Sequence, residues 1–358
     1  MRTVVVLAVT VVSTLAATLA GPPGAMAARP TSRVPSAGDQ SGRVAANLRV
    51  ATFNVRNVSL DGSGTLATWA ERRGTVIAQI LGQAVDVIGV QEVNPSKKFA
   101  PRLVAGHNQY VDLRNGLNAA GGAYELTNRY AYNCKRPSTS WKCKPKNRKS
   151  SHSDRILYNT ATLTLVKQGK LKYHAQVASH SPSHLGWAVL RSRLNGAEFL
   201  FTTTHLEPKV RKVRKAQWRE MIKRIDKVRD GRPVVAVGDF NTTKYSPVAA
   251  KMLPRMRKHG YGDAIGQRYK QNPVRSPRPQ VMVNGWINSL NRGSRDVRTF
   301  SYETDRSRTG DHVDWIFASK GLPVLEHAVV VDYDPATLMM NGVVPSDHNM
   351  LRATLSLG

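Results

Sequence analysis

The side chains of Asp239 and Asn241 lie two residues apart, directly after an apolar stretch of the sequence. Residues 234–237 are typical of a strand that is buried on both faces, and Gly238 ends that run. Residues i and i+2 of an extended backbone point the same way, so we expect Asp239 and Asn241 to face one site. An Asp can accept a proton or bind a metal, and an Asn can hold an oxyanion without titrating. The pair suits phosphoester hydrolysis, although a strand that ends in an Asx turn has the same pattern.

Other apolar runs also end in polar side chains that can do chemistry. They are Asn54, Glu92, His205, Asp314, Asp347 and His348. Each alone is compatible with a turn or cap, and a single histidine after a strand is more often structural. The strand ends of a layered α/β sheet converge on one edge, so together these residues predict one site. Clustered carboxylates repel each other unless a divalent cation binds them, and oxygen ligands favour Mg²⁺, Mn²⁺ or Ca²⁺ over Zn²⁺.

Alternating and continuous apolar runs predict the strands that carry these side chains. The expected strands cover residues 48–54, 85–93, 155–158, 161–166, 187–193, 198–205, 234–237, 314–318 and 350–355. A helix over residues 67–83 connects the first two and completes an αβ unit. Asn195-Gly196 is a strong hairpin signal between two neighbouring strands. Residues 94–125 show no clear pattern, and residues 266–310 are expected to be mostly loop.

The segment 209–229 has the periodicity of a helix with one apolar face. Residues on that face are Val210, Val213, Gln217, Met221, Ile225 and Val228. The basic residues Arg211, Lys212, Lys215, Arg219 and Lys223 lie elsewhere on it. A solvated outer helix explains these charges at least as well as a binding face does.

The N-terminal residues 1–27 have the pattern of a secretory signal peptide: a charged start, an apolar run and an A-x-A cleavage site. An uncleaved membrane anchor is the rival interpretation. Residues 28–46 read as a disordered leader, and residues 47–358 as a single catalytic domain. No later stretch is apolar enough to span a bilayer. We therefore expect a secreted, extracellular monomer with no stable membrane association after cleavage.

The formal charge of +29 is far larger than solubility alone requires. It predicts a polyanionic partner, which could be nucleic acid, anionic lipid or an acidic cell-wall polymer. Charge that serves only solubility is the alternative.

The two cysteines, Cys134 and Cys143, enclose the start of a basic segment that extends to residue 149. A local disulfide is expected in an exported chain, whereas two thiols without a nearby His pair are too few for zinc. Residues in this segment that we expect to bind substrate are Trp141, Lys142, Lys144, Lys146, Arg148 and Lys149. A solvated, disulfide-closed loop is the competing interpretation.

Six motifs, in their order along the chain, resemble those of the endonuclease/exonuclease/phosphatase superfamily. They are TFNVRN, VIGVQEV, TTHL, VVAVGDFN, DHVDWIF and PSDHNML. The resemblance covers residues 47–357, and GDFN with a distant SDH is a specific combination. It implies an α/β fold in which two mixed β-sheets are flanked by helices, a four-layered sandwich. It also implies phosphoester hydrolysis that depends on a divalent cation, with Mg²⁺ the first expectation.

The resemblance also implies a role for each motif residue. Glu92 is similar to the metal-binding glutamate, with Asn54 beside it, and Asp347 to a second metal-side aspartate. Asp239 resembles the residue that activates water or handles the leaving-group proton, and Asn241 the one that orients phosphate. His348 is similar to the phosphate-binding histidine with Asp314 as its partner. His205 matches the histidine of the deoxyribonuclease and sphingomyelinase branches, for which Asp154 is a weak candidate partner acid.

The substrate is not determined by these motifs. A secreted nuclease is the first expectation. The charge of +29, the basic segment with Trp141 and the basic helix all support it, because phosphate contacts supply most non-specific nucleic-acid affinity. Three alternatives remain open. They are a sphingomyelinase or phospholipase C-like enzyme, with Trp286-Ile287 as a candidate membrane contact, a phosphomonoesterase, and a catalytically silent polyanion-binding module.

Overall fold

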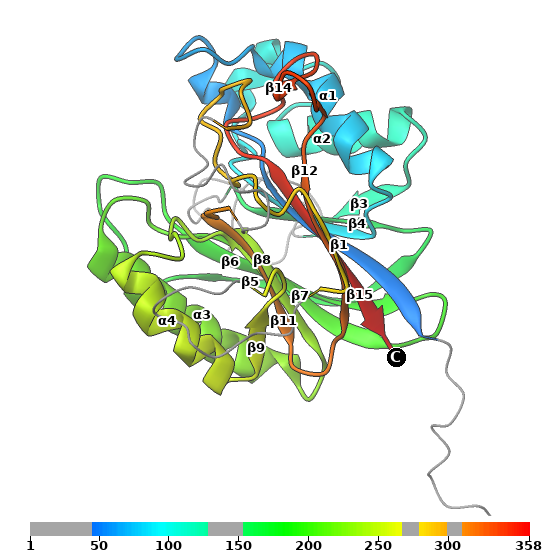
Figure 1. Ribbon diagram of the computed structural model, residues 1–358, viewed down its shortest axis with the longest axis vertical. Coiled ribbons are helices and arrows are strands. Elements are labelled where there is room, and N and C mark those ends of the chain that lie inside the picture. Colours follow the sequence, from blue (N-terminus) through cyan, green and yellow to red (C-terminus); the bar gives the residue numbers. More distant parts are fainter. Residues whose placement is uncertain (1–44, 128–152, 267–278, 299–309) are drawn as a thin grey trace, which may run out of the picture. The chain divides into compact units, whose positions relative to one another are not determined.

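Two mixed β-sheets form the centre of the computed structural model, which describes residues 45–127, 153–266, 279–298 and 310–358 (Figure 1). The seven-stranded sheet has the order β10 (Val281–Val283), β12 (Val324–Val330), β15 (Met350–Leu357), β1 (Ala46–Asn54), β2 (Val87–Gln91), β4 (Arg155–Asn159) and β3 (Tyr124–Leu126). The six-stranded sheet has the order β5 (Leu163–Lys172), β6 (His184–Ser192), β7 (Glu198–His205), β8 (Val234–Asp239), β11 (Asp314–Ser319) and β9 (Tyr261–Asp263). A separate pair joins β13 (Tyr333–Asp334) to β14 (Met339–Met340).

Strand direction within both sheets is mixed. β1 runs parallel to β2 and β7 parallel to β8, while β15 and β11 run antiparallel to β1 and β8. The C-terminal ends of β1, β2, β7 and β8 and the N-terminal ends of β11 and β15 therefore meet at one edge of the sandwich. This edge is where the sequence places its polar residues.

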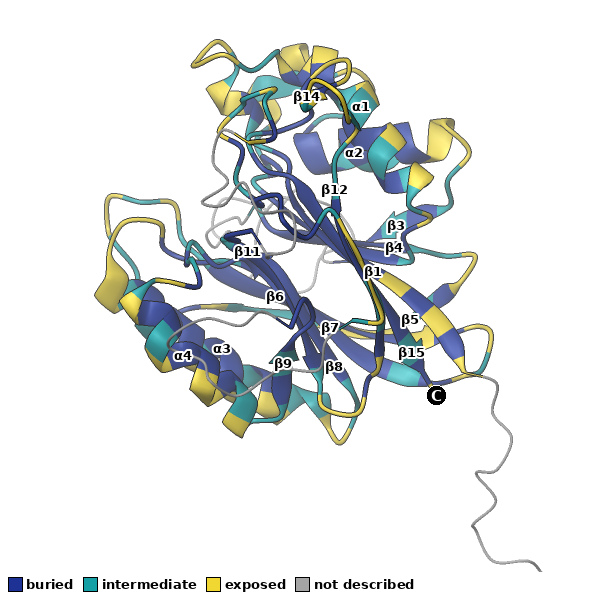
Figure 2. Ribbon diagram, in the orientation of Figure 1, coloured by how far each residue is buried: buried dark blue, intermediate teal, exposed yellow. Residues whose placement is uncertain are grey.

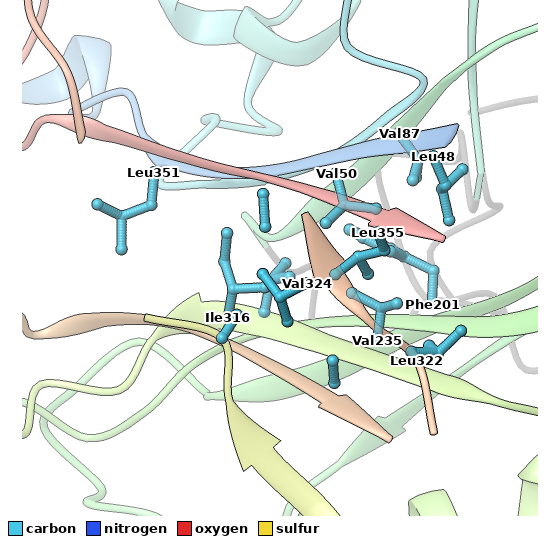
Figure 3. Close-up of a cluster of buried hydrophobic side chains, with 14 of the residues drawn as sticks. Leu48, Val50, Val87, Phe201, Val235, Ile316, Leu322, Val324, Leu351 and Leu355 are labelled. Atoms are coloured by element: carbon cyan, nitrogen blue, oxygen red, sulfur yellow. The ribbon is translucent and has the colours of Figure 1, made fainter. Parts of the chain in front are cut away.

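The alternation of side chains along β1 explains the layered packing. Leu48 and Val50 point into a core between the two sheets, where Phe201, Val235 and Leu355 meet them (Figure 3). Ala51 and Phe53 belong to a second core, under the helices α1 (Trp69–Gly82) and α2 (Gln109–Ala119). A third core lies between the six-stranded sheet and the helices α3 (Arg211–Arg229) and α4 (Pro247–Lys258). The expected sandwich of two sheets flanked by helices is confirmed, and burial on both faces is visible in Figure 2.

Two α-helices of the structure are absent from the expectations. α2 lies within residues 94–125, and it contains Gly116, where a Cβ atom would come within 2.4 Å of Ile77. Contact with α1 stabilises this helix despite its weak apolar pattern. α4 has Pro247 in its first turn and Pro254 in its interior. Because proline inside a segment argues against a helix, the sequence pattern does not predict α4. Short 3₁₀ helices occupy Val58–Leu60 and Lys97–Arg102.

The buried face of α3 also differs in part from the expected face. Val210 is exposed and precedes the helix, whereas Trp218 and Ile222 are buried. Gln217, Met221 and Ile225 are buried as expected. The actual face is therefore rotated toward the large indole of Trp218, which packs against Phe240 with ring centroids 4.8 Å apart.

Several expectations concern residues that lie outside the described ranges. These are the signal peptide and the leader up to residue 44, the cysteines Cys134 and Cys143, and the basic residues 142–149 with Trp141. Among the helices that the structure does describe, none combines the length and apolar character needed to cross a bilayer. The described strands and helices from residue 45 onward belong to one compact unit, which spans residues 43–358.

Candidate active site

The strand register brings three predicted side chains of the six-stranded sheet together. His205 is opposite Asp239 in the parallel pairing of β7 with β8, and Asp314 is opposite Asp239 in the antiparallel pairing of β8 with β11. From the facing sheet, β1 ends at Asn54 and β2 ends one residue before Glu92. Asp347 and His348 lie three and two residues before the start of β15. Both sheets thus deliver functional groups to the same edge.

Asp239 lies at the centre of this group and is buried. Its Oδ2 atom accepts a hydrogen bond of 3.2 Å from Asn54 Nδ2 and lies 3.4 Å from His205 Nε2 and 3.8 Å from His348 Nε2. One carboxylate oxygen therefore faces groups from both sheets.

The backbone around Asp239 departs from an ordinary strand end. Gly238 has a φ of +149°, and a Cβ atom there would come within 2.1 Å of the Thr204 carbonyl oxygen. Only glycine fits this close approach of β7 and β8. Asn241 is left-handed, with a φ of +47°, and its N–H donates to Asp239 Oδ1 over 2.8 Å.

The extended backbone expected from Asp239 to Asn241 is wrong, and the alternative, a strand that ends in an Asx turn, is what the structure contains. β8 ends at Asp239, so the two-residue alternation does not extend to Asn241. An Asx turn brings Asn241 beside the carboxylate instead, and its Nδ2 atom donates to the Leu206 carbonyl oxygen.

His348 and Asp314 form a buried pair. His348 Nδ1 lies 2.8 Å from Asp314 Oδ2, and the backbone N–H of Asp314 donates to the hydroxyl of Ser289. Burial works against a charged imidazole, but the attraction of Asp314, Asp239 and Asp347 outweighs it and raises the pKa of His348 to about 10. His348 is therefore an imidazolium at neutral pH, with Nε2 directed toward Asp239.

His205 is a second cationic candidate. Burial lowers its pKa, yet the carboxylates of Asp239 and Glu92 outweigh burial, so that the pKa is raised above its ordinary value. Asp154, the candidate partner acid, is buried, and its Oδ1 atom has no hydrogen-bond partner among the described residues. Burial raises the pKa of Asp154 to about 7. His205 Nε2 forms its ion pair with Asp239, and the more distant Asp154 adds to the attraction that raises the pKa of His205. Asp154 as the partner acid of His205 stays a prediction.

Glu92 and Asn54 lie on the other side of Asp239. Asn54 Nδ2 donates to Glu92 Oε1 over 3.0 Å, and the N–H of Asn57 donates to Glu92 Oε2 over 3.0 Å. Glu92 and Arg56 are both left-handed, with φ values of +64° and +54°. Strained non-glycine residues of this kind concentrate at functional sites.

Arg56 is a site residue that sequence reasoning missed. Its Nη1 atom lies 2.6 Å from Asp347 Oδ2, and its Nη2 atom donates to the Ser63 carbonyl oxygen. The motif TFNVRN contains Arg56, but no spacing rule connects it to Asp347, which is 291 residues away. Ser289 was also missed, because it lies in a stretch without a secondary-structure pattern.

A hard divalent cation fits part of this donor set. Glu92 Oε1 and Asp239 Oδ2 both accept from Asn54 Nδ2, so two carboxylate oxygens, which are ligands that Mg²⁺ prefers, lie close together. Asn54 Oδ1 accepts from the N–H of Arg56, so the Asn54 carboxamide would have to rotate to offer its oxygen to a cation. Asp347 is engaged by Arg56, so this arrangement does not offer its Oδ2 atom freely. Ligand atoms of Asp239, Asp314 and His348 also lie within 4.8 Å of one another, but the His348–Asp314 hydrogen bond already uses two of them.

Comparisons with known proteins agree with the fold and the motifs. The family model described as the Endonuclease/Exonuclease/phosphatase family matches residues 51–348. A family protein from Bacteroides thetaiotaomicron has 19% identity and a TM-score of 0.61, with 88% of this chain and 97% of that chain covered. A mannosyl-6-phosphatase from the same organism has 19% identity and a TM-score of 0.59, with 86% and 99% covered.

A D. rerio TDP2 structure, complexed with single strand DNA product, has 16% identity and a TM-score of 0.51, with 87% of this chain and 99% of that chain covered. At these identities the structural likenesses show the fold alone. A search of curated proteins found no significant match. Since the family model covers most of the chain, and the strand ends carry its motifs, this protein belongs to the endonuclease/exonuclease/phosphatase family.

Proposed function

We propose that this chain is an exported, divalent-metal-dependent phosphodiesterase that hydrolyses the backbone of nucleic acids. The observation that carries the proposal is the buried His348–Asp314 pair, whose imidazolium lies 3.8 Å from the Asp239 carboxylate. A phosphodiester is anionic and repels nucleophiles. The His348 imidazolium can offset the negative charge of the phosphate, and the neighbouring Asp239 carboxylate can activate the attacking water.

The residues of the chain account for each proton. His348 Nε2 donates a hydrogen bond to a non-bridging phosphate oxygen. Asp239 accepts a proton from the water whose oxygen attacks phosphorus, and the P–O bond on the opposite side breaks. His205 gives its proton to the leaving oxygen, and the carboxylates of Asp239 and Glu92, which raise its pKa, favour the protonated form. His205 Nε2 lies 3.4 Å from Asp239 Oδ2, so the proton taken from water can return to His205.

Glu92 and Asn54 are the residues that would hold the divalent cation, next to Asp239. When bound, the cation supplies positive charge against the phosphate oxygens. The second metal role expected for Asp347 requires release of its ion pair with Arg56.

Nucleic acid is favoured as substrate by the charge of +29. The phosphomonoesterase alternative keeps one specific support, the likeness in fold to a mannosyl-6-phosphatase. Trp286 and Ile287 do not form the membrane contact that the lipid alternative expected, because both side chains are buried. It retains the exposed apolar strand Val281–Val283, so a lipid substrate belongs in the test.

Export is supported by the signal-peptide pattern of residues 1–27 and by the two cysteines. Edman sequencing of protein secreted by an expressing bacterial host tests it. The expected N-terminus is Ala28, and retention of the full-length chain in the cell membrane would contradict export.

The test of substrate is hydrolysis by purified protein with Mg²⁺ of plasmid DNA, RNA, sphingomyelin and a sugar phosphate monoester. His348→Asn is the matched control, since a contaminating hydrolase would be equally active in both preparations. We expect cleavage of nucleic acid that the control lacks. Preferred hydrolysis of sphingomyelin or of the monoester would refute the nuclease assignment.

A further inference from the structure

A row of cations runs along the solvent side of α3. We define the α3 cation ridge as Lys212, Lys215, Arg219, Lys223 and Lys227. Steps of three or four residues place neighbouring members one above the other on the helix surface. All are exposed except the half-buried Lys215, and the apolar side of α3 packs against the six-stranded sheet (Figure 1).

No carboxylate of the described residues neutralises this ridge. None of its five side chains forms a hydrogen bond or an ion pair with another residue of the described ranges. The two acidic residues of α3 are engaged elsewhere. Glu220 binds His174 over 2.6 Å, and Asp226 binds His259 and Tyr261, each over 2.6 Å. Like charges spaced four residues apart destabilise a helix, so the ridge is an arrangement that an external anion would stabilise.

A short connection leads from the candidate active site to the start of the ridge. Leu206 follows His205 and donates its N–H to the Asp239 carbonyl oxygen, and α3 starts five residues later. Arg214 fixes this connection through the carbonyl oxygens of Glu207 and Pro208. From Lys212 to Lys227 the helix rises about 22 Å, at about 1.5 Å per residue.

We infer that the α3 cation ridge binds the backbone of a nucleic-acid substrate away from the scissile bond, an inference that rests on the proposed function. About 22 Å corresponds to about six base pairs at 3.4 Å each, so only a polymer can occupy the active site and the ridge together. A membrane-binding helix needs apolar side chains next to its cations. Trp218, Met221 and Ile225 of α3 are instead buried in the protein core, which favours nucleic acid over an anionic lipid surface.

The test compares two triple variants that lose the same charge. The ridge variant is Arg219→Gln, Lys223→Gln and Lys227→Gln. The control variant is Lys167→Gln, Arg193→Gln and Lys320→Gln, three exposed residues outside α3. Glutamine keeps a high helix propensity, so α3 is expected to remain folded. Binding of a 30-base-pair duplex is measured by fluorescence anisotropy with chelator present, which prevents cleavage.

We expect the ridge variant to bind the duplex at least about tenfold more weakly at 0.1 M salt, the effect of losing one or more phosphate contacts. Its plot of log affinity against log salt should flatten by up to about 2.7, because each duplex contact contributes about 0.9. The control variant should stay within about threefold of wild type, and kcat/KM on a small phosphodiester with Mg²⁺ should be unchanged in both.

Equal binding losses and equal slopes in the ridge and control variants would overturn the inference. A ridge-specific loss of binding to phosphatidylserine vesicles, without loss on the duplex, would overturn the assignment to nucleic acid. Failure of the wild-type protein to cleave any nucleic acid would instead refute the proposed function. The anisotropy assay is independent of cleavage, so the two failures are distinguishable.

Discussion

The substitution Asp314→Asn tests the electrostatic role of the His348–Asp314 pair. Asn has nearly the size of Asp, but it lacks the charge that holds the His348 imidazolium. The rise in the pKa of His348 from 6.5 to about 10 corresponds to about 5 kcal/mol in favour of the charged form. In the variant, only the attraction of Asp239 and Asp347 remains to oppose burial, so the pKa of His348 should fall well below that of the wild type.

The expected effect at pH 7.5 is a loss of about 10²–10³ in kcat, the scale of removing one transition-state hydrogen-bond donor. The pH profile separates this cause from misfolding. Wild-type His348 stays charged up to its folded pKa of about 10, so its contribution to the rate is lost only above that pH. In the variant the contribution of His348 to the rate should be lost at a lower pH than in the wild type, and it should return as pH falls.

The assay is kcat on a small phosphodiester from pH 5 to 10, together with an NMR titration of the His348 ring. Circular dichroism checks that the variant is folded. A folded variant that keeps wild-type kcat and a wild-type ring titration would refute the reasoning. The same pair stabilises the fold below pH 6.5, and this stabilisation is lost as pH rises toward about 10.

Four further predictions concern the metal, the phosphate contact of His348, the close approach of strands β7 and β8 at Gly238, and the basic segment between Cys134 and Lys149. Hydrolysis should stop in excess chelator and return with Mg²⁺, and full activity in chelator would exclude metal dependence at Glu92 and Asp239. His348→Asn should lower kcat by several orders of magnitude with the fold intact, and a loss below about tenfold would contradict its assignment. Gly238→Ala should lower the free energy of unfolding in urea by about 3 kcal/mol or more, because its Cβ meets the Thr204 carbonyl at 2.1 Å. The matched control Gly74→Ala, in open space on α1, should be neutral or stabilising by up to about 1 kcal/mol. Cys134 and Cys143 should resist alkylation without reductant, and replacing Lys142, Lys144, Lys146 and Lys149 by Ala should flatten the salt dependence of duplex binding by up to about 3.6. Two alkylatable thiols would exclude the disulfide, and an unchanged slope would favour a solvated loop.

The layered fold could be predicted because the sequence motifs resemble those of a superfamily with this fold, and the continuous apolar runs agree with it. A run such as 234–237 is buried on both sides, so it needs a facing sheet on one side and helices on the other. The polar residues at the strand ends are brought together for the same reason, since the register of β7, β8 and β11 places His205, Asp239 and Asp314 opposite one another.

Features that depend on tertiary contacts could not be predicted. Gly116 in α2 and Pro254 in α4 are local signals against a helix, and packing overrides both. The turn at Asn241 was only the alternative expectation, because the sequence pattern alone does not distinguish its left-handed backbone from an extended one. The ion pair of Arg56 with Asp347 joins residues that are 291 positions apart, so the sequence around either residue does not indicate its partner.

The most direct test of the central claim asks which phosphorus–oxygen bond is broken. A single-stranded 30-mer with a 5′-terminal phosphate carries internal phosphodiesters and one phosphomonoester in the same molecule. Mass spectrometry of the products, after incubation with Mg²⁺ and wild-type protein or His348→Asn, distinguishes the two reactions. The account predicts shorter fragments with wild-type protein only. A full-length 30-mer that has lost only its terminal phosphate would contradict it.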